Sequence, residues 1–307
     1  MRRAFVDTLT DLAARDDRVA ILTGDLGFQV FDGFIARFPD RYVNVGIAEA
    51  QVVCAAAGMA RVGFRPFAYS IASFMTARPF EQIRFAVAYP RLPVVFVGAG
   101  GGYCYAQSGV SHHAPDDFAL MGLIPGMTVV APGDPHEVQA LLPQLVQLDG
   151  PSYIRIGKFG EPAYEADSPI VLGKGRILRP GRKVAILTTG ETAPIALDAL
   201  QRLAADGISP TVCQFHTLRP LDTAILADLA AAGHITFVCV EECSPQGGLH
   251  RQVALWIQSA GLSIRHVRLG PPDEFVLGNP DRNAFRVACC FDVVGIADAC
   301  RRTWPTT

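Results

Sequence analysis

The sequence predicts an α/β fold: two consecutive α/β domains with mainly parallel sheets. Short runs of apolar, often β-branched residues alternate with longer segments of helical pattern along most of the 307 residues, as in a parallel sheet covered by helices on both faces. A stretch rich in glycine, proline and charge interrupts this alternation at residues 159–182, and such a stretch is typical of a connection between domains. We therefore expect a first domain at residues 1–165, a linker at 166–182 and a second domain at 183–307.

The first domain is predicted to alternate strands and helices in chain order. Its strands are nearly continuous apolar runs, as expected for strands that are buried on both faces. Its first helix stops before Pro39, which cannot continue a helix. We expect strands at residues 19–25, 42–46, 65–71, 92–101, 127–134 and 152–158, and helices at 32–38, 47–62, 76–89, 116–123 and 136–148.

The second domain repeats this alternation without a recognisable repeat in the sequence itself. Its apolar runs are again short and rich in β-branched residues, and helical patterns lie between them. We expect strands at residues 183–190, 210–218, 235–242 and 263–270, and helices at 192–205, 222–232 and 250–260.

The composition narrows the classes of function. With 18% charged residues, a formal net charge of -2 and no dense lysine or arginine run, the chain lacks the clustered positive charge that binds nucleic acids and anionic membrane surfaces. No uncharged apolar run reaches the roughly 18 residues of a membrane span, and the first residues include no apolar signal core. The eight cysteines are scattered without a CxxC pair, so we expect reduced thiols, no metal site in this chain and a cytoplasmic location.

The segment VNVGIAEAQVVCAAAGMA at residues 43–60 carries the first candidate functional group. A strand ends at Gly46, and Glu49 follows in the first turn of an apolar, alanine-rich helix. An acidic side chain at this position also complements the helix dipole, which is the structural explanation. Glu49 becomes a functional candidate through the segments that accompany it.

Those segments carry aromatic and polar side chains next to glycines and prolines. Core packing, a surface loop or a turn would explain each of them singly, and only their order along the chain makes them specific. They are Asp25 in GDLG (24–27), Phe74 and Arg78 in IASFMTARPFEQIR (71–84), Ser108, His112 and His113 in SGVSHHAPDDFALMGLIPGMTVVAPGD (108–134), and Lys158 in SYIRIGKFGEP (152–162).

In this order the segments resemble the transketolase family, from about residue 3 to about residue 300. The resemblance includes the family's Gly-(Ile/Val)-x-Glu signature at Glu49, and it continues through the acidic pair Glu241 and Glu242 and the glycine turn at 247–248. It implies a pyrimidine-binding first domain and a C-terminal domain that mainly builds subunit contacts.

The resemblance implies thiamine diphosphate as cofactor. In the family, the matching glutamate hydrogen-bonds a ring nitrogen of the cofactor's aminopyrimidine and so favours its reactive tautomer. Glu49 is therefore expected to be both catalytic and cofactor-binding. Phe74 is the candidate for stacking on the aminopyrimidine, and Asp25 and Arg78 are further candidates for cofactor contacts.

The resemblance also implies substrate contacts. His112 matches the family histidine near the thiazolium, where an imidazole can hydrogen-bond a developing alkoxide and pass on its proton. His113 takes the place of a family glutamine. Lys158 falls where related enzymes place an arginine on the substrate phosphate, which a lysine binds only as a point charge. Ser108 replaces a sugar-binding aspartate, and this loss of a charged acceptor argues against the standard sugar-phosphate pair.

One cofactor-binding element of the family is missing. The sequence has no Gly-Asp-Gly motif followed by asparagine, the family's site for the diphosphate and Mg²⁺, and its only asparagines are Asn44, Asn279 and Asn283. We therefore expect the diphosphate and Mg²⁺ to be held mainly by a separately encoded N-terminal transketolase subunit. This chain would be the C-terminal, beta-type subunit of a split transketolase, in an α2β2 heterotetramer.

The expected reaction is the transfer of a two-carbon ketol unit from a ketose donor to an aldehyde acceptor. Two alternatives stay open. One is the beta subunit of a 2-oxo-acid dehydrogenase, which would decarboxylate a 2-oxo acid, and the other is a non-catalytic subunit that stabilises its partner. A Rossmann NAD enzyme is disfavoured because no GxGxxG follows the first strand.

Overall fold

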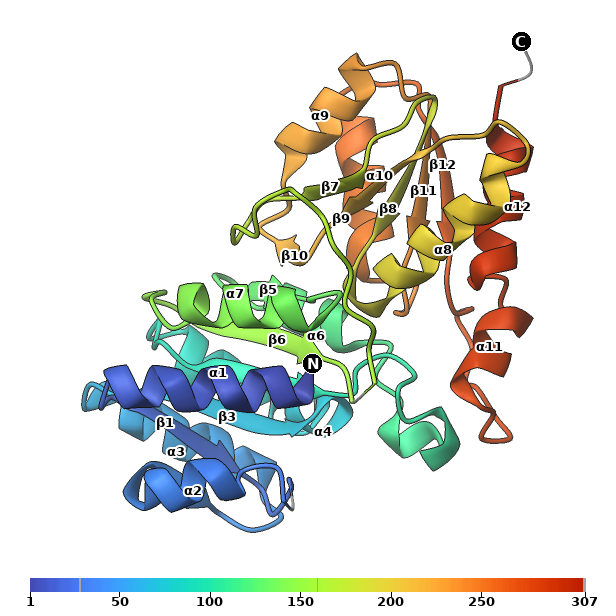
Figure 1. Ribbon diagram of the computed structural model, residues 1–307. Coiled ribbons are helices and arrows are strands. Elements are labelled where there is room, and N and C mark those ends of the chain that lie inside the picture. Colours follow the sequence, from blue (N-terminus) through green and yellow to red (C-terminus); the bar gives the residue numbers. More distant parts are fainter. Residues whose placement is uncertain (28, 159, 306–307) are drawn as a thin grey trace.

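The computed structural model describes residues 1–27, 29–158 and 160–305, which form two α/β domains (Figure 1). The first contains a seven-stranded sheet in the order β10-β5-β6-β4-β3-β1-β2, and the second a five-stranded sheet in the order β12-β11-β8-β9-β7. Among the described residues, all pairs of neighbouring strands are parallel except β10 with β5 and β7 with β9. The predicted fold class is confirmed.

The strands of the first sheet lie where the apolar runs predict them. The strands β1 and β4, with sequences VAILT and VFVGA, are buried along their whole length, because helices cover both faces of the sheet. The strands are β1 (Val19–Thr23), β2 (Tyr42–Asn44), β3 (Arg65–Ile71), β4 (Val95–Ala99), β5 (Thr128–Val130) and β6 (Ser152–Ile156).

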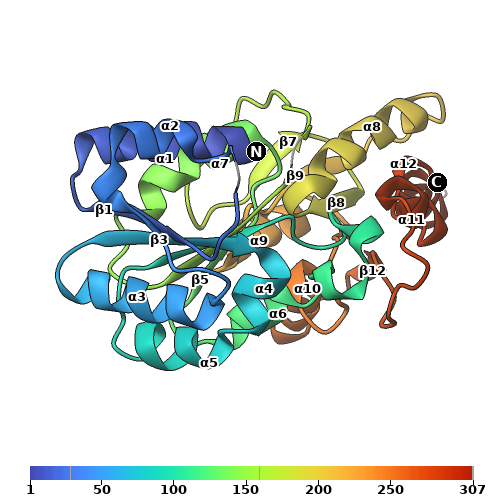
Figure 2. The same ribbon diagram turned by 90° about the horizontal axis from the view of Figure 1, so that it is seen from below.

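Helices cover the first sheet on two sides. In Figure 2, α1 and α7 lie above the sheet, and α3, α5 and α6 lie below it. Asp134 caps α7 by accepting a hydrogen bond from the Glu137 amide. The elements are α1 (Arg2–Arg15), α2 (Asp32–Arg37), α3 (Glu49–Arg61), α4 (Ala72–Ala77), α5 (Phe80–Gln82), α6 (Asp117–Leu123) and α7 (Pro135–Leu145), with 3-10 turns η1 (Pro39–Arg41), η3 (Ala106–Ser108) and η4 (Val110–His112).

Residues 76–89 do not form the single helix that we predicted. The helix α4 ends at Ala77, α5 is one short turn, and a π-helical segment, η2 (Ile83–Ala88), completes the stretch. Pro79 lies at the break, where its missing amide hydrogen and its ring disfavour a continuous helix. The break leaves Arg78 at the end of α4.

The second sheet is also mainly parallel, and its edge strand β7 lies within the residues that we expected to be a linker. Residues 2–15, 282–288 and 293–303 are helical in the structure, and these three helices were not predicted. The elements are β7 (Arg176–Arg179), β8 (Val184–Thr188), η5 (Gly190–Thr192), α8 (Ala193–Ala204), β9 (Thr211–Gln214), α9 (Thr223–Ala231), β11 (Thr236–Val240), α10 (Gly248–Ser259), β12 (Arg265–Leu269), α11 (Arg282–Ala288) and α12 (Val293–Thr303).

The short strand β10 (Thr217–Arg219) connects the two domains. It follows β9 of the second sheet but pairs antiparallel with β5 of the first, opposite Val130 and Val129. Around it, Met121 and Val129 of the first domain belong to the same buried hydrophobic cluster as Leu218 and Leu249 of the second half of the chain. One buried hydrophobic cluster therefore spans both domains.

The carboxyl ends of β1, β2, β3, β4 and β6 meet at one edge of the first sheet because these strands are parallel. Open α/β sheets bind ligands at this edge. No helix in the described part of the chain combines the length and apolar character that crossing a membrane requires.

Candidate active site

Glu49 lies at the carboxyl edge of the first sheet, in a largely enclosed position. Gly46, with φ of 76°, makes the turn from β2 into α3, and Glu49 is the first residue of that helix. Only 6% of the Glu49 surface is exposed. The N-cap residue of α3, Ala48, makes no side-chain capping hydrogen bond, and the first amides of the helix are directed toward the same edge.

Arg78 is the partner of Glu49. Its Nη1 donates a hydrogen bond of 2.9 Å to Glu49 Oε1, and half of the Arg78 side chain is exposed. The same guanidinium lies over the ring of Phe74, with its carbon 4.0 Å from the ring centroid. A nearly buried carboxylate, a cation and an aromatic ring thus form one cluster at the surface.

His112 extends this cluster. Its ring lies edge-on to Phe74, with the centroids 5.1 Å apart, and its Nδ1 is 3.0 Å from the hydroxyl of Ser111. Partial burial, followed by the charges of Arg78 and His113, lowers the pKa of His112 below its ordinary value. This shift favours the neutral imidazole, in which one ring nitrogen can accept a proton.

Ser108 and Lys158 both line a pocket of about 550 Å³ between the two domains. The Lys158 ammonium is 4.5 Å from the centroid of the Tyr105 ring, and the Tyr105 ring is 6.0 Å from that of His112. Tyr105 is the contact that sequence reasoning missed, because a single aromatic residue in a glycine-rich loop resembles ordinary packing. It links the Lys158 pocket to the cluster around Glu49.

His113 points away from its neighbour His112. It is buried, its Nε2 is 3.0 Å from the carbonyl oxygen of Ala106, and its ring lies 4.9 Å from that of Tyr103. The structure therefore places His113 inside the loop that carries His112 rather than beside Glu49.

Asp25 lies in the turn after β1 and is exposed. Its amide donates to Asn44 Oδ1 at 2.9 Å, and Asn44 Nδ2 donates to Asp25 Oδ1 at 3.1 Å. The turn is adjacent to the segment before Glu49, because a Cβ on Gly24 would lie 3.1 Å from the Gly46 carbonyl oxygen. Asp25 thus borders the candidate site without a direct contact to the Arg78 cluster among the hydrogen bonds of the described residues.

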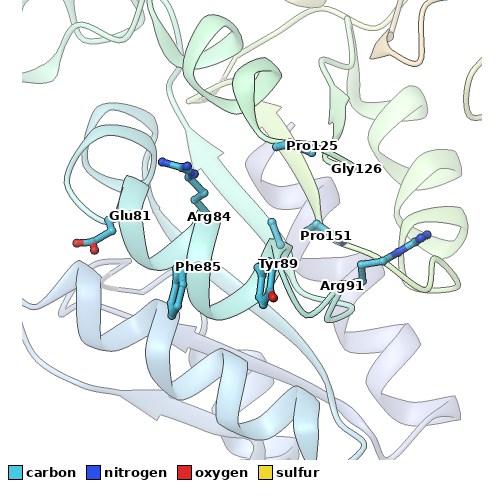
Figure 3. Close-up of a pocket in the computed structure, with 9 residues that line it drawn as sticks. Glu81, Arg84, Phe85, Tyr89, Arg91, Pro125, Gly126 and Pro151 are labelled. Atoms are coloured by element: carbon cyan, nitrogen blue, oxygen red, sulfur yellow. The ribbon is translucent and has the colours of Figure 1, made fainter.

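A further pocket lies elsewhere, at the amino ends of β4, β5 and β6. It measures about 730 Å³. Figure 3 shows Phe85 and Tyr89 on η2 and Pro125, Gly126 and Pro151 in the loops beside them. The rings of Phe85 and Tyr89 stack 5.9 Å apart and are 72% and 82% exposed. This pocket is at the opposite edge of the sheet from Glu49, so its size does not make it the active site.

The arrangement at the carboxyl edge can hold a planar, basic heterocycle. Glu49 offers a hydrogen-bond acceptor or a shared proton, Phe74 offers an aromatic face, and His112 offers a neutral imidazole. No group of three or more histidine, cysteine, aspartate or glutamate side chains with metal-binding geometry occurs among the described residues.

Comparison with known proteins identifies the family of the chain. Residues 1–159 match the family model "Transketolase, pyrimidine binding domain", and residues 173–286 match "Transketolase, C-terminal domain". The chain is 37% identical to the 6-deoxy-6-sulfo-D-fructose transketolase subunit SqwH of Clostridium sp. (strain MSTE9), over 81% of this chain and 78% of that protein.

Two further relatives differ in how much of their own length is matched. A 1-deoxy-D-xylulose-5-phosphate synthase of Azoarcus sp. (strain BH72) is 33% identical over 99% of this chain but only 48% of its own length. The solved structure of a split gene transketolase, described as an inactive beta4 tetramer, superposes with a TM-score of 0.88 and 30% identity, over 98% of this chain and 97% of that one. The chain belongs to the transketolase family of thiamine-diphosphate enzymes and contains the family's pyrimidine-binding and C-terminal domains.

Proposed function

We propose that this chain is the beta-type subunit of a thiamine-diphosphate-dependent transketolase, and that it transfers a two-carbon ketol unit from a ketose donor to an aldehyde acceptor. The observation that carries the proposal is the position of Glu49: it is nearly buried, yet its one side-chain partner among the described residues is the half-exposed Arg78. Such a carboxylate can exchange a surface cation for a ring nitrogen of a bound aminopyrimidine.

The residues present fit one half of the cofactor. An acceptor carboxylate beside the ring of Phe74 suits the aminopyrimidine, which has a basic ring nitrogen and an aromatic face. They do not fit the other half, because the sequence lacks the family's motif for the diphosphate and Mg²⁺. Both groups would therefore be held mainly by a partner subunit.

Four of the chain's own residues would each have a part in the reaction. Glu49 would share a proton with the pyrimidine nitrogen, and Phe74 would keep the ring in one plane. Arg78 would move off the carboxylate and remain over Phe74. His112 would hydrogen-bond a substrate oxygen on which charge develops and carry its proton. When bound, thiamine diphosphate supplies the carbanion chemistry.

Substrate contacts are proposed for the pocket that Ser108 and Lys158 line. Lys158 would attract an anionic group, and Ser108 would hydrogen-bond a hydroxyl. His113 would act indirectly, by holding the loop that carries His112, since its imidazole contacts the carbonyl of Ala106. Asp25 would border the cofactor from the turn after β1.

Exposed apolar side chains around Glu49 support a partner subunit. Ile47, two residues before Glu49, is 79% exposed, and Val110 is exposed in the loop of His112. Apolar surface of this kind is characteristic of interaction sites. We propose that the partner is a separately encoded N-terminal transketolase subunit and that the complex is an α2β2 heterotetramer. All eight cysteines are free thiols, which supports a cytoplasmic location.

The similarity to a 1-deoxy-D-xylulose-5-phosphate synthase favours a second candidate. In it, the same Glu49 cluster would serve a thiamine-diphosphate enzyme whose donor is a 2-oxo acid rather than a ketose. The two candidates share the cofactor and differ in the donor, so a screen of both donor classes separates them.

The test begins with the partner protein. This chain alone should show no turnover with thiamine diphosphate and Mg²⁺, and mixing with the co-purified partner should restore it. In the complex, Glu49→Gln should lower turnover by about 100-fold or more without affecting assembly. Glu81→Gln, which changes an exposed glutamate of α5, is the matched control. Unchanged turnover in Glu49→Gln would contradict the proposal.

A further inference from the structure

The loop at residues 102–114 carries three of the candidate site residues and is closed at its base. The Gly102 amide donates to the Ala114 carbonyl at 3.1 Å, and the Ala114 amide donates back to Gly102 at 2.8 Å. Between these ends lie Ser108, His112 and His113. The position of the His112 imidazole therefore depends on the base of the loop as well as on its contact with Phe74.

A carboxylate of the second domain contacts this base. Glu242 follows β11, is 4% exposed, and accepts a hydrogen bond of 2.7 Å from the Tyr103 amide. Its own carbonyl oxygen is so close to the loop that a Cβ on Gly102, whose φ is 59°, would lie only 2.7 Å away. Glycine at position 102 allows this close approach of the two domains.

Two arginines hold Glu242 in place. Arg282 Nε donates to Oε1 at 2.9 Å, and Arg286 Nε and Nη2 donate to Oε2 at 2.9 and 2.7 Å. Burial alone would favour the protonated acid, but these two guanidiniums outweigh it and lower the pKa of Glu242 to about 2. The carboxylate is therefore charged and hydrogen-bonded on both oxygens at any pH at which the enzyme works.

The first domain holds the other end of the loop base. Arg155 of β6 donates to the Ala114 carbonyl at 3.3 Å and to the carbonyl of Glu242 at 3.1 Å. It is fixed in turn by an ion pair with the buried Asp117. The ring of Tyr103 packs 4.4 Å from that of Phe285 in α11, so the loop base is held by charge and by apolar contact.

We propose that Glu242 is a positioning residue: through Tyr103 it fixes the loop 102–114, so that the C-terminal domain determines where His112 lies in the active site. This inference rests on the proposed function. It gives the C-terminal domain a part in the reaction in addition to subunit contacts.

The chain contains a matched control for this idea. Glu137 of α7 is also a fully buried carboxylate that pairs with an arginine from the second sheet, and Arg176 Nη1 donates to it at 2.5 Å. Its other partners include the amide of Gly133 and the side chain of Gln214. None of these three belongs to the loop 102–114.

The experiment compares Glu242→Gln with Glu137→Gln. Amide hydrogen exchange of the whole chain reports loop order without any cofactor. In Glu242→Gln we expect the amides of residues 103–114 to exchange about tenfold faster, while in Glu137→Gln they should stay at the wild-type rate. In the complex with its partner, kcat of Glu242→Gln should fall by about 100-fold, the effect of a displacement of about 1 Å at a catalytic group. KM should change much less.

A second variant covers the case in which Glu242→Gln fails to fold. Arg286→Gln removes one cation and leaves the contact between Tyr103 and Glu242, and it should give the same pattern with a smaller amplitude. Unchanged exchange in the loop, or faster exchange with unchanged kcat, would overturn the inference and leave the role of Glu49 intact. A wild-type complex without thiamine-diphosphate turnover would instead contradict the proposed function.

Discussion

Arg78 contacts two candidate residues at once: it donates a 2.9 Å hydrogen bond to Glu49 and stacks 4.0 Å above the ring of Phe74. The first contact must be given up when Glu49 binds a pyrimidine nitrogen, whereas the second can persist. The pair therefore stabilises the site in the form without cofactor.

We predict a measurable coupling between Arg78 and Glu49 in the chain alone. Arg78→Ala leaves the nearly buried Glu49 carboxylate without its cation. Glu49→Gln removes the negative charge, so that the uncharged side chain no longer requires a cation beside it. A double-mutant cycle on the free energy of unfolding, measured with urea, should give a coupling of about 1 kcal/mol. Additive effects would mean that the ion pair contributes nothing to the stability of the site.

For His112 we predict a loss of turnover and a defined pH dependence. His112→Asn in the complex should lower kcat by about 100-fold, because asparagine cannot carry a proton. Burial and the charges of Arg78 and His113 keep the pKa of His112 below 6.5, so kcat should decline only below pH 6.5. In Arg78→Ala, kcat should decline at a higher pH than in the wild type, because loss of the neighbouring positive charge raises the pKa of His112. His136→Asn, at an exposed position of α7, should match the wild type.

Lys158 is expected to distinguish phosphorylated from unphosphorylated substrates. Lys158→Gln should raise KM about tenfold for a substrate with a phosphate group, because a point charge is lost, and should leave KM for its unphosphorylated counterpart unchanged. Lys174→Gln, at an exposed lysine of the second half, is the control. Equal effects on both substrates would remove Lys158 from phosphate recognition.

Because burial disfavours protonation of His216, we predict that the fold becomes less stable in acid. Burial, and then the charge of Arg176, lowers the pKa of His216 to about 4. The contribution of the neutral His216 side chain to stability is fully present above 6.5, its pKa in the unfolded chain. It is lost as the pH falls towards about 4, its pKa in the folded chain. Urea unfolding should show the free energy falling by about 1 kcal/mol per pH unit within this window. His216→Gln should flatten that slope, and an unchanged slope would assign it to other groups.

Much of the fold follows from local sequence. The runs VAILT, RPFAYSI and TFVCV are strands within two residues of the predicted bounds, because uninterrupted apolar and β-branched residues suit strands covered on both faces. The strand β10 was not separated from β9, because only three residues form it. Its position is set by contacts with β5, which no local pattern encodes.

The candidate site was only partly accessible from the sequence. The motif around Glu49 placed the carboxylate in the first turn of a helix, where the structure has it. Its partner Arg78 is 29 residues away, and only the fold brings the two together. Both His112 and His113 were predicted to contact the substrate, but the end of a 3-10 turn sends their successive side chains in different directions.

Because β10 pairs with β5, the two domains cannot be separated into independently stable units. A polypeptide ending at residue 165 would leave the outer edge of β5 unpaired and would uncover Met121 and Val129, which pack against the second half of the chain. An unpaired strand edge next to exposed apolar side chains promotes pairing with other chains and aggregation. Recombination or truncation at the apparent domain border would therefore yield fragments that aggregate. The two domains can be inherited, fused or exchanged only together, as one module.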